Sequence, residues 1–388
     1  MQSPFSTIEL LPYDPILGVA KQFNEDPREI KVNLGIGTYK TNEGASYLFK
    51  SVHAAEKILL EQISSKDYLP IEGEPLFLRK IIALTFGNNT DESKVFALQS
   101  LGGTGALSLA AIFLHRFLSS TIAISTPSWL NHVPLFKNAG FDVHLYPYYK
   151  DHHLSFEETF NALKKLPSSS IILLQTACHN PTGTDFSKDQ WQNLLDLVKT
   201  KQFFPLFDNS YQGLGNSVED DSYAIRLFHE NGIEMAVTTG CSKNFGLYGE
   251  RVGAFIFSLN ESTGHLAIMS QLRKIIRSLY SSPPMHGAKI VTKILDSAHL
   301  RTMWIEDLAT IKTRIQQMRT RLAKGLNMPS LERQQGFFSL LGINEMQVLR
   351  LKEEKGIYLP SNGRINIAGL TTSNLDYVIE SLKPFLCT

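Results

Sequence analysis

The chain has 388 residues, of which 43% are hydrophobic and 19% charged, and its formal net charge is +1. This composition is typical of a globular protein with a large core, and the length favours two lobes. The near-neutral charge gives no support to a nucleic-acid or membrane-surface partner, and no apolar run is long enough to cross a bilayer. The three cysteines form no CxxC pair, and the start lacks the pattern of a secretory signal, so a cytoplasmic protein is expected.

Short β-rich runs alternate with helical stretches from about residue 94 to 259. The runs predicted as strands are 95–99, 121–126, 142–148, 171–177, 203–208, 234–240 and 252–258. Residues 105–118 and 188–201 are predicted helices, and in the second, apolar residues recur at i, i+3, i+4 and i+7 from Trp191. This alternation predicts an α/β domain with a largely parallel sheet, in which ligands bind at the carboxyl ends of the strands.

The two ends of the chain differ from this middle part. The first 45 or so residues show no alternation and predict an extended arm, whereas residues 262–325 predict mostly helix. The remainder predicts a short strand, a helix, a second strand region and a final helix, at 336–342, 344–356, 363–369 and 376–386. These C-terminal elements predict a smaller α+β lobe.

Four stretches rich in glycine, proline or asparagine lie where predicted strands end. They are LGGTGAL (101–107), HNPTG (179–183), FDNSYQG (207–213) and GCSKNFGLYGERVG (240–253). Taken alone, each has an ordinary structural interpretation: a glycine turn before a helix, an Asn-Pro turn, a capping carboxylate and a solvated lysine. The first is also superficially similar to a dinucleotide-binding turn, but the acidic residue expected about twenty residues on is missing.

Together the four stretches supply a lysine and an anion site. Lys243 lies between a strand end and several glycines, where partial desolvation would lower the pKa of its amine and make it a nucleophile. The backbone amides of Gly103, Thr104 and Gly105 precede an apolar helix and could hold a phosphate at its N-terminus.

The same stretches add a buried acid, Asp208, and two hydrogen-bond donors, Asn180 and Tyr211. A reactive lysine, an acid, such donors and an anion site are what pyridoxal 5'-phosphate requires of a protein. The lysine forms the Schiff base, the acid keeps the pyridine nitrogen protonated, and the donors hold the ring phenolate oxygen. The glycines around Lys243 would let the chain approach this cofactor closely.

Five motifs closely resemble those of the aspartate and aromatic amino-acid aminotransferase family, pyridoxal phosphate enzymes of fold type I. They are GCSKNFGLYGERVG, CHNPTG, FDNSYQG, GGTGAL and TPSWLNH, and the resemblance extends from residue 14 to residue 369. It implies a homodimer whose subunit has a large cofactor-binding α/β domain, with a mostly parallel central sheet flanked by helices, and a smaller α+β domain. The implied division is an N-terminal arm at 1–14, the small domain at 15–46 and 312–388, and the large domain at 47–311.

The resemblance also implies a role for each matching residue. Lys243 would be the Schiff-base lysine and proton shuttle, with Asp208 and Tyr211 completing the catalytic set and His132 supporting Asp208. The residues implied to bind the cofactor are Gly103, Thr104, Trp129, Asn180, Asp208, Tyr211, Ser242, Lys243, Arg251 and, from a second subunit, Tyr68. Those implied to bind substrate are Gly37, Trp129, Asn180, Arg364 for the α-carboxylate and Arg277, across the dimer, for a distal carboxylate. No metal ligands are implied.

Two positions depart from the family pattern. Gly240 replaces a serine that usually contacts the phosphate, and Gly240→Ser is therefore expected to tighten cofactor binding unless residue 240 has a positive φ. Ser282 stands where aspartate-preferring members often have asparagine, and serine there is more familiar in aromatic-preferring relatives.

The leading hypothesis is an aminotransferase that moves an amino group between L-aspartate, together with aromatic amino acids, and 2-oxoglutarate by a ping-pong mechanism. One alternative has aromatic amino acids as the main substrates, and a second is a β-lyase or decarboxylase, which two carboxylate-binding arginines disfavour. A nucleotide-dependent oxidoreductase using LGGTGAL and a non-catalytic binding protein are the remaining alternatives. The intact set of Lys243, Asp208, Tyr211 and Arg251 disfavours the last.

Overall fold

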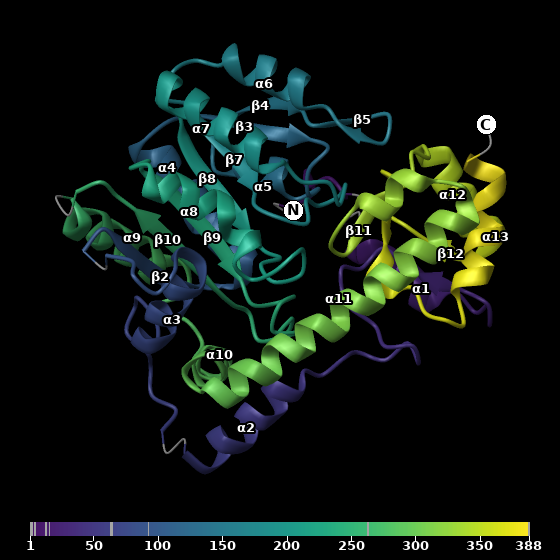
Figure 1. The fold of residues 1–388 in the computed structure, drawn as a ribbon, viewed down its shortest axis with the longest axis horizontal. Coiled ribbons are helices and arrows are strands. Elements are labelled where there is room, and N and C mark those ends of the chain that lie inside the picture. The colour runs from purple at the N-terminus through teal and green to yellow at the C-terminus, as the bar shows by residue number, and fades with distance from the viewer. Residues whose placement is uncertain are drawn as a thin grey trace.

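The computed structural model describes residues 3, 5–11, 14, 16–62, 65–91, 93–261 and 264–386. A larger lobe built on a seven-stranded sheet lies beside a smaller lobe with two short two-stranded sheets, and one long helix connects them (Figure 1). Within the described ranges, no helix combines the length and the apolar character needed to cross a bilayer.

The large sheet contains every strand predicted for the middle of the chain. Its strand order is β2-β10-β9-β8-β7-β3-β4, and only β10 runs antiparallel to its neighbours. The strands are β2 (Val95–Leu101), β3 (Thr121–Thr126), β4 (Asp142–Pro147), β7 (Ile171–Gln175), β8 (Phe204–Asn209), β9 (Met235–Gly240) and β10 (Val252–Ser258). The α/β fold class with a mainly parallel central sheet is therefore confirmed.

Helices cover both faces of this sheet because its strands are apolar on both faces. Ile171 and Leu173 of β7 belong to one hydrophobic core, whereas Ile172 and Leu174 belong to the other. The first core is closed by α4 (Gly102–Phe117), α5 (His132–Asn138) and α9 (His265–Leu279). The second is closed by α3 (Pro75–Phe86), α6 (Phe156–Lys164), α7 (Lys188–Lys201) and α8 (Tyr223–Glu230). A hairpin of β5 (Tyr149–Lys150) and β6 (His153–Leu154) and a short 3-10 turn, Asp220–Ser222, lie in the connections.

The smaller lobe combines segments from both ends of the chain. β1 (Val32–Asn33) pairs in parallel with β12 (Ile357–Tyr358), and β11 (Phe338–Leu340) pairs antiparallel with β13 (Arg364–Asn366). Helices α12 (Glu345–Lys355) and α13 (Leu375–Leu386) and the 3-10 turns Pro329–Arg333 and Ile367–Gly369 complete it. The predicted C-terminal elements are thus all present.

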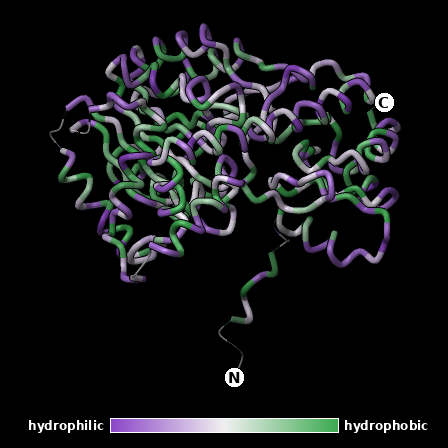
Figure 2. The backbone as a smooth tube through the Cα atoms, turned by 60° about the horizontal axis from the view of Figure 1, so that its bottom comes forward, coloured by the Kyte–Doolittle hydropathy of each residue, from purple (hydrophilic) through white to green (hydrophobic). Residues whose placement is uncertain are grey.

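The expectation of an extended arm over the first 45 residues is wrong in part. Residues 17–25 form helix α1 (Leu17–Glu25), which has no side-chain cap at its N-terminus and packs on β1 and β12. The ring of Phe23 contacts that of Tyr358 edge-on, with centroids 5.5 Å apart. The helix is therefore stabilised by tertiary contacts that no local signal announces. Residues 5–11 do extend away from the rest of the chain (Figure 2).

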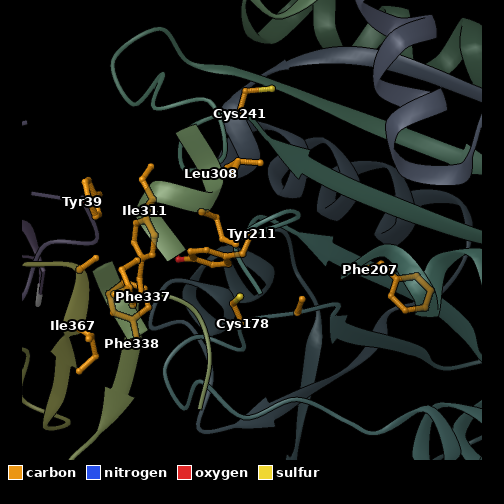
Figure 3. Packing of buried hydrophobic residues seen from close by; sticks show 14 of the residues in the cluster. Tyr39, Cys178, Phe207, Tyr211, Cys241, Leu308, Ile311, Phe337, Phe338 and Ile367 are labelled. Carbon is orange, nitrogen blue, oxygen red and sulfur yellow. The ribbon is translucent and has the colours of Figure 1, made fainter. Parts of the chain in front are cut away.

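Helix α11 (Ala298–Leu326) connects the two lobes and packs on α2 (Lys50–Gln62) and α10 (His286–Asp296). Trp304 of α11 is fully buried, stacks on Phe245 and donates from Nε1 to the carbonyl of Asn244 at 2.6 Å. The expected domain boundary at 311/312 falls inside this continuous helix. One hydrophobic core extends from the sheet into the smaller lobe, and Figure 3 shows Tyr211, Phe337 and Ile311 at that junction. The division into domains remains a prediction.

Candidate active site

A pocket opens at the carboxyl ends of β7, β8 and β9, beside the N-terminus of α4. This is the edge at which a parallel sheet places its ligands. Every same-chain residue expected to bind the cofactor lies in its wall, which consists of Gly103, Thr104, Leu107, Trp129, Gln175, Asn180, Asp208, Ser210, Tyr211, Gly240, Ser242, Lys243 and Arg251. Loops that are far apart in the sequence are thus brought to one place by the order of the strands.

Asp208 is the buried acid of the pocket. It lies near the end of β8, and its Oδ2 is 3.0 Å from Nε2 of His132, as expected for a supporting histidine. Nδ1 of that ring is 2.8 Å from the hydroxyl of Ser128. Because Nε2 faces a carboxylate, the proton of a neutral ring belongs on Nε2, and Ser128 then donates to Nδ1. The ring of His132 also contacts the ring of Trp129 edge-on, with centroids 5.2 Å apart, which helps to fix its orientation.

Lys243 extends into the same pocket, with Nζ 5.7 Å from the ring centroid of Tyr211. Desolvation lowers the pKa of its amine to about 8; Asp208 opposes this shift, and Arg251 and Arg364 add to it. At pH 7 about a tenth of such amines are neutral, whereas an unperturbed lysine has about 0.03% in that form. The pocket therefore provides the conditions that a nucleophilic lysine requires.

A glycine-lined anion site lies at the start of α4. The helix begins at Gly102, so the amides of its first turn have no partner within the helix, and Leu101 provides no side-chain cap. Arg251 closes the site by donating to the hydroxyl of Ser242 at 3.3 Å and to the carbonyls of Tyr248 and Leu101. Gly102 has φ +70°, which favours glycine, and a Cβ there would be 2.6 Å from Nη2 of Arg251, so a larger residue would also move that guanidinium.

Gly240 faces the same anion site, and its surroundings contradict the expected effect of a serine. Its φ is not positive, so the anticipated backbone obstacle is absent. A Cβ at this position would instead be 2.8 Å from the backbone nitrogen and 3.2 Å from the Cα of Gly103. A serine would therefore displace one of the amides that the site presents.

Arg364 forms a second cationic position on the small-lobe side of the pocket. It is 2% exposed, and its guanidinium donates to Oδ1 of Asn180 at 3.2 Å and to the carbonyl of Gly35 at 2.5 Å. Its guanidinium lies 4.0 Å from the ring centroid of Phe338, and its Nε has no hydrogen-bond partner in the part of the chain that the structure describes. Burial lowers the pKa of this arginine to about 10. Its partners in the described residues are neutral, which leaves the guanidinium able to bind a carboxylate.

Gly37 lies beside this position for a steric reason. A Cβ at Gly37 would be 2.8 Å from Cζ of Phe338, the ring that stacks on Arg364. A larger residue would therefore displace that ring. The expected role of Gly37 in lining a substrate site remains a prediction.

Like Gly37 and Arg364, the expected site residues Tyr68 and Arg277 are not in the wall of this pocket. Tyr68 is 93% exposed, and Arg277 is exposed on α9, where it donates to the hydroxyl of Ser281. Both were expected to act on the pocket of a second subunit, so their exposure in a single chain neither places them at a site nor removes them from one. Their roles remain predictions.

Sequence reasoning missed three polar residues of the site. Gln175 holds the backbone of Asn180, with Oε1 accepting its N–H at 2.8 Å and Nε2 donating to its carbonyl at 3.1 Å. Ser128 supports His132, and Ser210 donates to Asp208. The available signal was position, because each follows or ends an apolar strand, where a polar side chain faces the ligand edge of the sheet.

The pocket fits pyridoxal 5'-phosphate. Two cations in its wall, Lys243 and Arg251, outnumber the carboxylate of Asp208, and a third, Arg364, is hydrogen-bonded to the wall residue Asn180, so the pocket favours an anionic ligand. The unpaired amides of α4 lie beside Arg251 and suit a phosphate, while Asp208 and Lys243 suit a pyridine nitrogen and an aldehyde.

This arrangement is that of an enzyme acting on amino groups, and the comparisons agree. The family model described as "Aminotransferase class I and II" matches residues 29–382. The chain belongs to that family, as its motifs predicted.

The most similar relatives include aspartate and aromatic-amino-acid aminotransferases. The chain is 42% identical over 397 residues to "Aspartate aminotransferase" of Pseudomonas aeruginosa, covering 99% of this chain and 100% of that protein. It is 39% identical to "Aromatic-amino-acid aminotransferase" of the same organism, covering 98% of each. Among solved structures, the aromatic-amino-acid aminotransferase from Burkholderia pseudomallei, covalently bound to pyridoxal phosphate, has a TM-score of 0.95 at 40% identity, covering 99% of this chain and 100% of that one.

Proposed function

We propose that this aminotransferase uses pyridoxal 5'-phosphate to move an amino group between L-aspartate, together with aromatic amino acids, and 2-oxoglutarate in two half-reactions. The observation that carries the proposal is one pocket holding an amine of lowered pKa, a buried carboxylate and Arg251, with Arg364 bonded to the pocket residue Asn180; neither arginine has an acidic partner among the described residues. The relatives named for aspartate and for aromatic amino acids support the two substrate classes.

The cofactor would be held by groups already in place. The first-turn amides of α4, the hydroxyl of Ser242 and the guanidinium of Arg251 would bind its phosphate. Asp208 would pair with the pyridine nitrogen, and Asn180 and Tyr211 would donate to the ring oxygen. When bound, pyridoxal 5'-phosphate supplies an electron sink conjugated to the α-carbon of the amino acid.

Lys243 would carry the proton. Its Nζ, neutral in a useful fraction of molecules near pH 7, would accept the proton from the substrate α-carbon and deliver it to the carbon on the other side of the amino nitrogen. Asp208 would hold a negative charge opposite the ring nitrogen throughout. Burial of Tyr211 raises the pKa of its phenol, which keeps the hydroxyl protonated as a donor.

Arg364 would bind the α-carboxylate through its two-pronged guanidinium. Because it is buried, the carboxylate would be held in a site from which most water is excluded, and the charge pair would be stronger there than in bulk water. The stacked ring of Phe338 fixes the plane of the guanidinium and, with it, the orientation of the α-carbon.

A homodimer is part of the proposal. Tyr68, Leu10 and Leu11 are 93%, 99% and 79% exposed, so they are free to contact a second copy of the chain. A second copy would cover them and would bring Tyr68 and Arg277 to the neighbouring pocket. A cytoplasmic location is proposed as well, and the two described cysteines, Cys178 and Cys241, are both free thiols, in agreement with it.

Aromatic amino acids as the main substrates are the second candidate. Ser282, in the turn that follows α9, supports it, because serine at this position is more familiar in aromatic-preferring relatives. An aspartate-preferring enzyme would need Arg277 to bind the distal carboxylate.

One spectrum and one kinetic panel test these proposals. The purified protein with pyridoxal 5'-phosphate should absorb near 360–430 nm, and the band should move to shorter wavelength with aspartate. The kcat/KM values of aspartate, glutamate, phenylalanine and tyrosine with 2-oxoglutarate would then rank the donors. The absence of a band would contradict the proposed function, and release of pyruvate, ammonia or CO2 without transfer would indicate a lyase or decarboxylase.

A further inference from the structure

A hydroxyl that none of these roles uses lies against the pocket carboxylate. Ser210 Oγ donates to Oδ1 of Asp208 at 2.6 Å, while His132 contacts the other carboxylate oxygen at 3.0 Å. Ser210 is partly buried and belongs to the pocket wall, so its hydroxyl borders the space that a ligand fills. We propose that Ser210 is a positioning residue that orients Asp208 toward bound pyridoxal 5'-phosphate. This inference rests on the proposed function.

The two donors together fix the plane of the carboxylate. The terminal torsion of an aspartate is broad and close to two-fold, so a single hydrogen bond from His132 leaves the group free to rock. A second donor on the opposite oxygen removes that freedom. An O–H to carboxylate bond of 2.6 Å lies in the range of charge-assisted hydrogen bonds, which are about twice as strong as neutral ones.

Two donors still leave the carboxylate able to accept more. Each carboxylate oxygen has about two lone-pair directions, so His132 and Ser210 use two of about four. The remaining directions are available to an N–H group in the pocket. Ser210 therefore orients the acceptor without occupying the position that a pyridinium nitrogen would need.

Ser210 lies next to the glycines of the anion site. A Cβ on Gly103 would be 3.4 Å from Oγ of Ser210 and 3.9 Å from the Cα of Gly240. These are van der Waals distances, so the hydroxyl of Ser210 lies between the carboxylate of Asp208 and the anion site and is close to both.

The variants Ser210→Ala and Ser210→Thr test the proposal in the full-length protein, with Ser170→Ala as the matched control. Ser170 is a buried serine that donates to the carbonyl of Pro167 at 2.8 Å, at the amino end of β7. The measurements are the Kd of the apoenzyme for pyridoxal 5'-phosphate, from absorbance titration, and the kcat and KM for aspartate. Ser210→Ala should weaken cofactor binding about tenfold and lower kcat, with KM changed less than twofold. Ser210→Thr, which keeps the hydroxyl, should recover most of the loss, and Ser170→Ala should match the wild type.

A double-mutant cycle with Asp208→Asn then identifies the partner. If the hydroxyl acts through Asp208, adding Ser210→Ala to Asp208→Asn should raise the cofactor Kd by less than twofold. Additive losses would assign the hydroxyl to another group, such as the phosphate, and would overturn the proposal. So would a wild-type Kd for Ser210→Ala. Failure of the wild-type protein itself to bind the cofactor would instead contradict the proposed function.

Discussion

Two buried aspartates close together in the sequence, Asp208 and Asp221, have different roles: the first faces the pocket, and the second stabilises a loop. Asp221 accepts backbone N–H bonds from Gly213, Gly215 and Asn216, all within 2.9 Å, and both of its oxygens serve the loop. Asp208 is contacted by two side chains and keeps acceptor directions facing the pocket. Burial of an acid is therefore, by itself, a poor sign of function.

The same contrast applies to the cations. Burial lowers the pKa of both Arg319 and Arg364 to about 10. Arg319 ties together the segment 336–339, donating to a hydroxyl and two backbone carbonyls. Arg364 lies against the pocket residue Asn180, where an incoming carboxylate can reach it. Nε is unpartnered in both arginines within the described residues, so proximity to the pocket, rather than burial or unused bonding capacity, distinguishes the functional group from the structural one.

The largest effect is expected from Lys243→Ala. Nucleophile and proton carrier are lost together, so transamination should fall by about 10⁴-fold or more. The protein should remain folded, because the lost amine is one whose charge is disfavoured by burial. Initial rates with aspartate and a thermal melt measure both. Lys188→Ala, which removes an exposed lysine, is the control, and activity of Lys243→Ala within tenfold of wild type would contradict the assignment.

The two aspartates should fail in opposite ways. Asp208→Ala should lower kcat by about 10²- to 10⁴-fold, because the electron sink loses its counter-charge, and should lower the free energy of unfolding less than Asp221→Ala, because two side-chain donors rather than three backbone amides lose their acceptor. Asp221→Ala should lower the free energy of unfolding by about 3 kcal/mol, since three amides lose their acceptor, and leave kcat per folded molecule within threefold. Urea titrations and active-site-normalised rates measure the pair. Similar changes in kcat and in the free energy of unfolding for the two variants would show that the two aspartates do not have separate roles.

Arg277→Leu tests the proposed distal-carboxylate site. If Arg277 reaches a neighbouring pocket, its loss leaves an acidic substrate with an unpaired, desolvated carboxylate, and kcat/KM for aspartate should fall by a few hundred-fold. The kcat/KM for phenylalanine should be nearly unaffected, because its ring carries no charge that would need a partner there. Arg301→Leu, at an exposed arginine of α11, is the control. Equal losses for both donors would show that Arg277 serves only its own helix.

Gly240→Ser is expected to weaken cofactor retention by about tenfold, in place of the tightening that the sequence alone predicted. A Cβ there would be 2.8 Å from the backbone nitrogen of Gly103, and displacement of that amide opposes any new hydrogen bond from the hydroxyl. Gly249→Ser, in the same loop but with no atom within 4 Å of its Cβ, is the matched control. Dialysis followed by absorbance measures cofactor retention. Tighter binding in Gly240→Ser would show that the backbone around Gly103 can move to accommodate the serine without losing its contact with the phosphate.

The smallest expected effect is a pH dependence of cofactor capture. The capturing form of Lys243 is the neutral amine, and with a pKa of about 8 its fraction rises about fivefold from pH 7 to pH 8 and less than twofold above pH 8. Stopped-flow absorbance of the apoenzyme mixed with pyridoxal 5'-phosphate follows this step. A rate that keeps rising tenfold per unit to pH 10 would show that the amine is solvated.

Local sequence patterns determined much of this protein. The seven strands of the large sheet and helix α7 follow from apolar runs and helical periodicity, which depend only on neighbouring residues. The motifs around Lys243, Asp208 and Asn180 identified the family and predicted the residues that line the pocket. Glycine, proline and charged residues at strand ends carry that information because they are costly or unusual there.

The remaining features could not be predicted from the sequence, because they depend on distances between segments far apart in the chain. Helix α1 exists through its contacts with β1 and β12, and the space beside Gly240 is set by the backbone of Gly103. The sequence shows Ser210 as an ordinary turn residue, and the folded strand end places its hydroxyl 2.6 Å from the carboxylate it serves. Local propensity cannot encode such approaches, since each is fixed by how complete sheets and helices pack on one another.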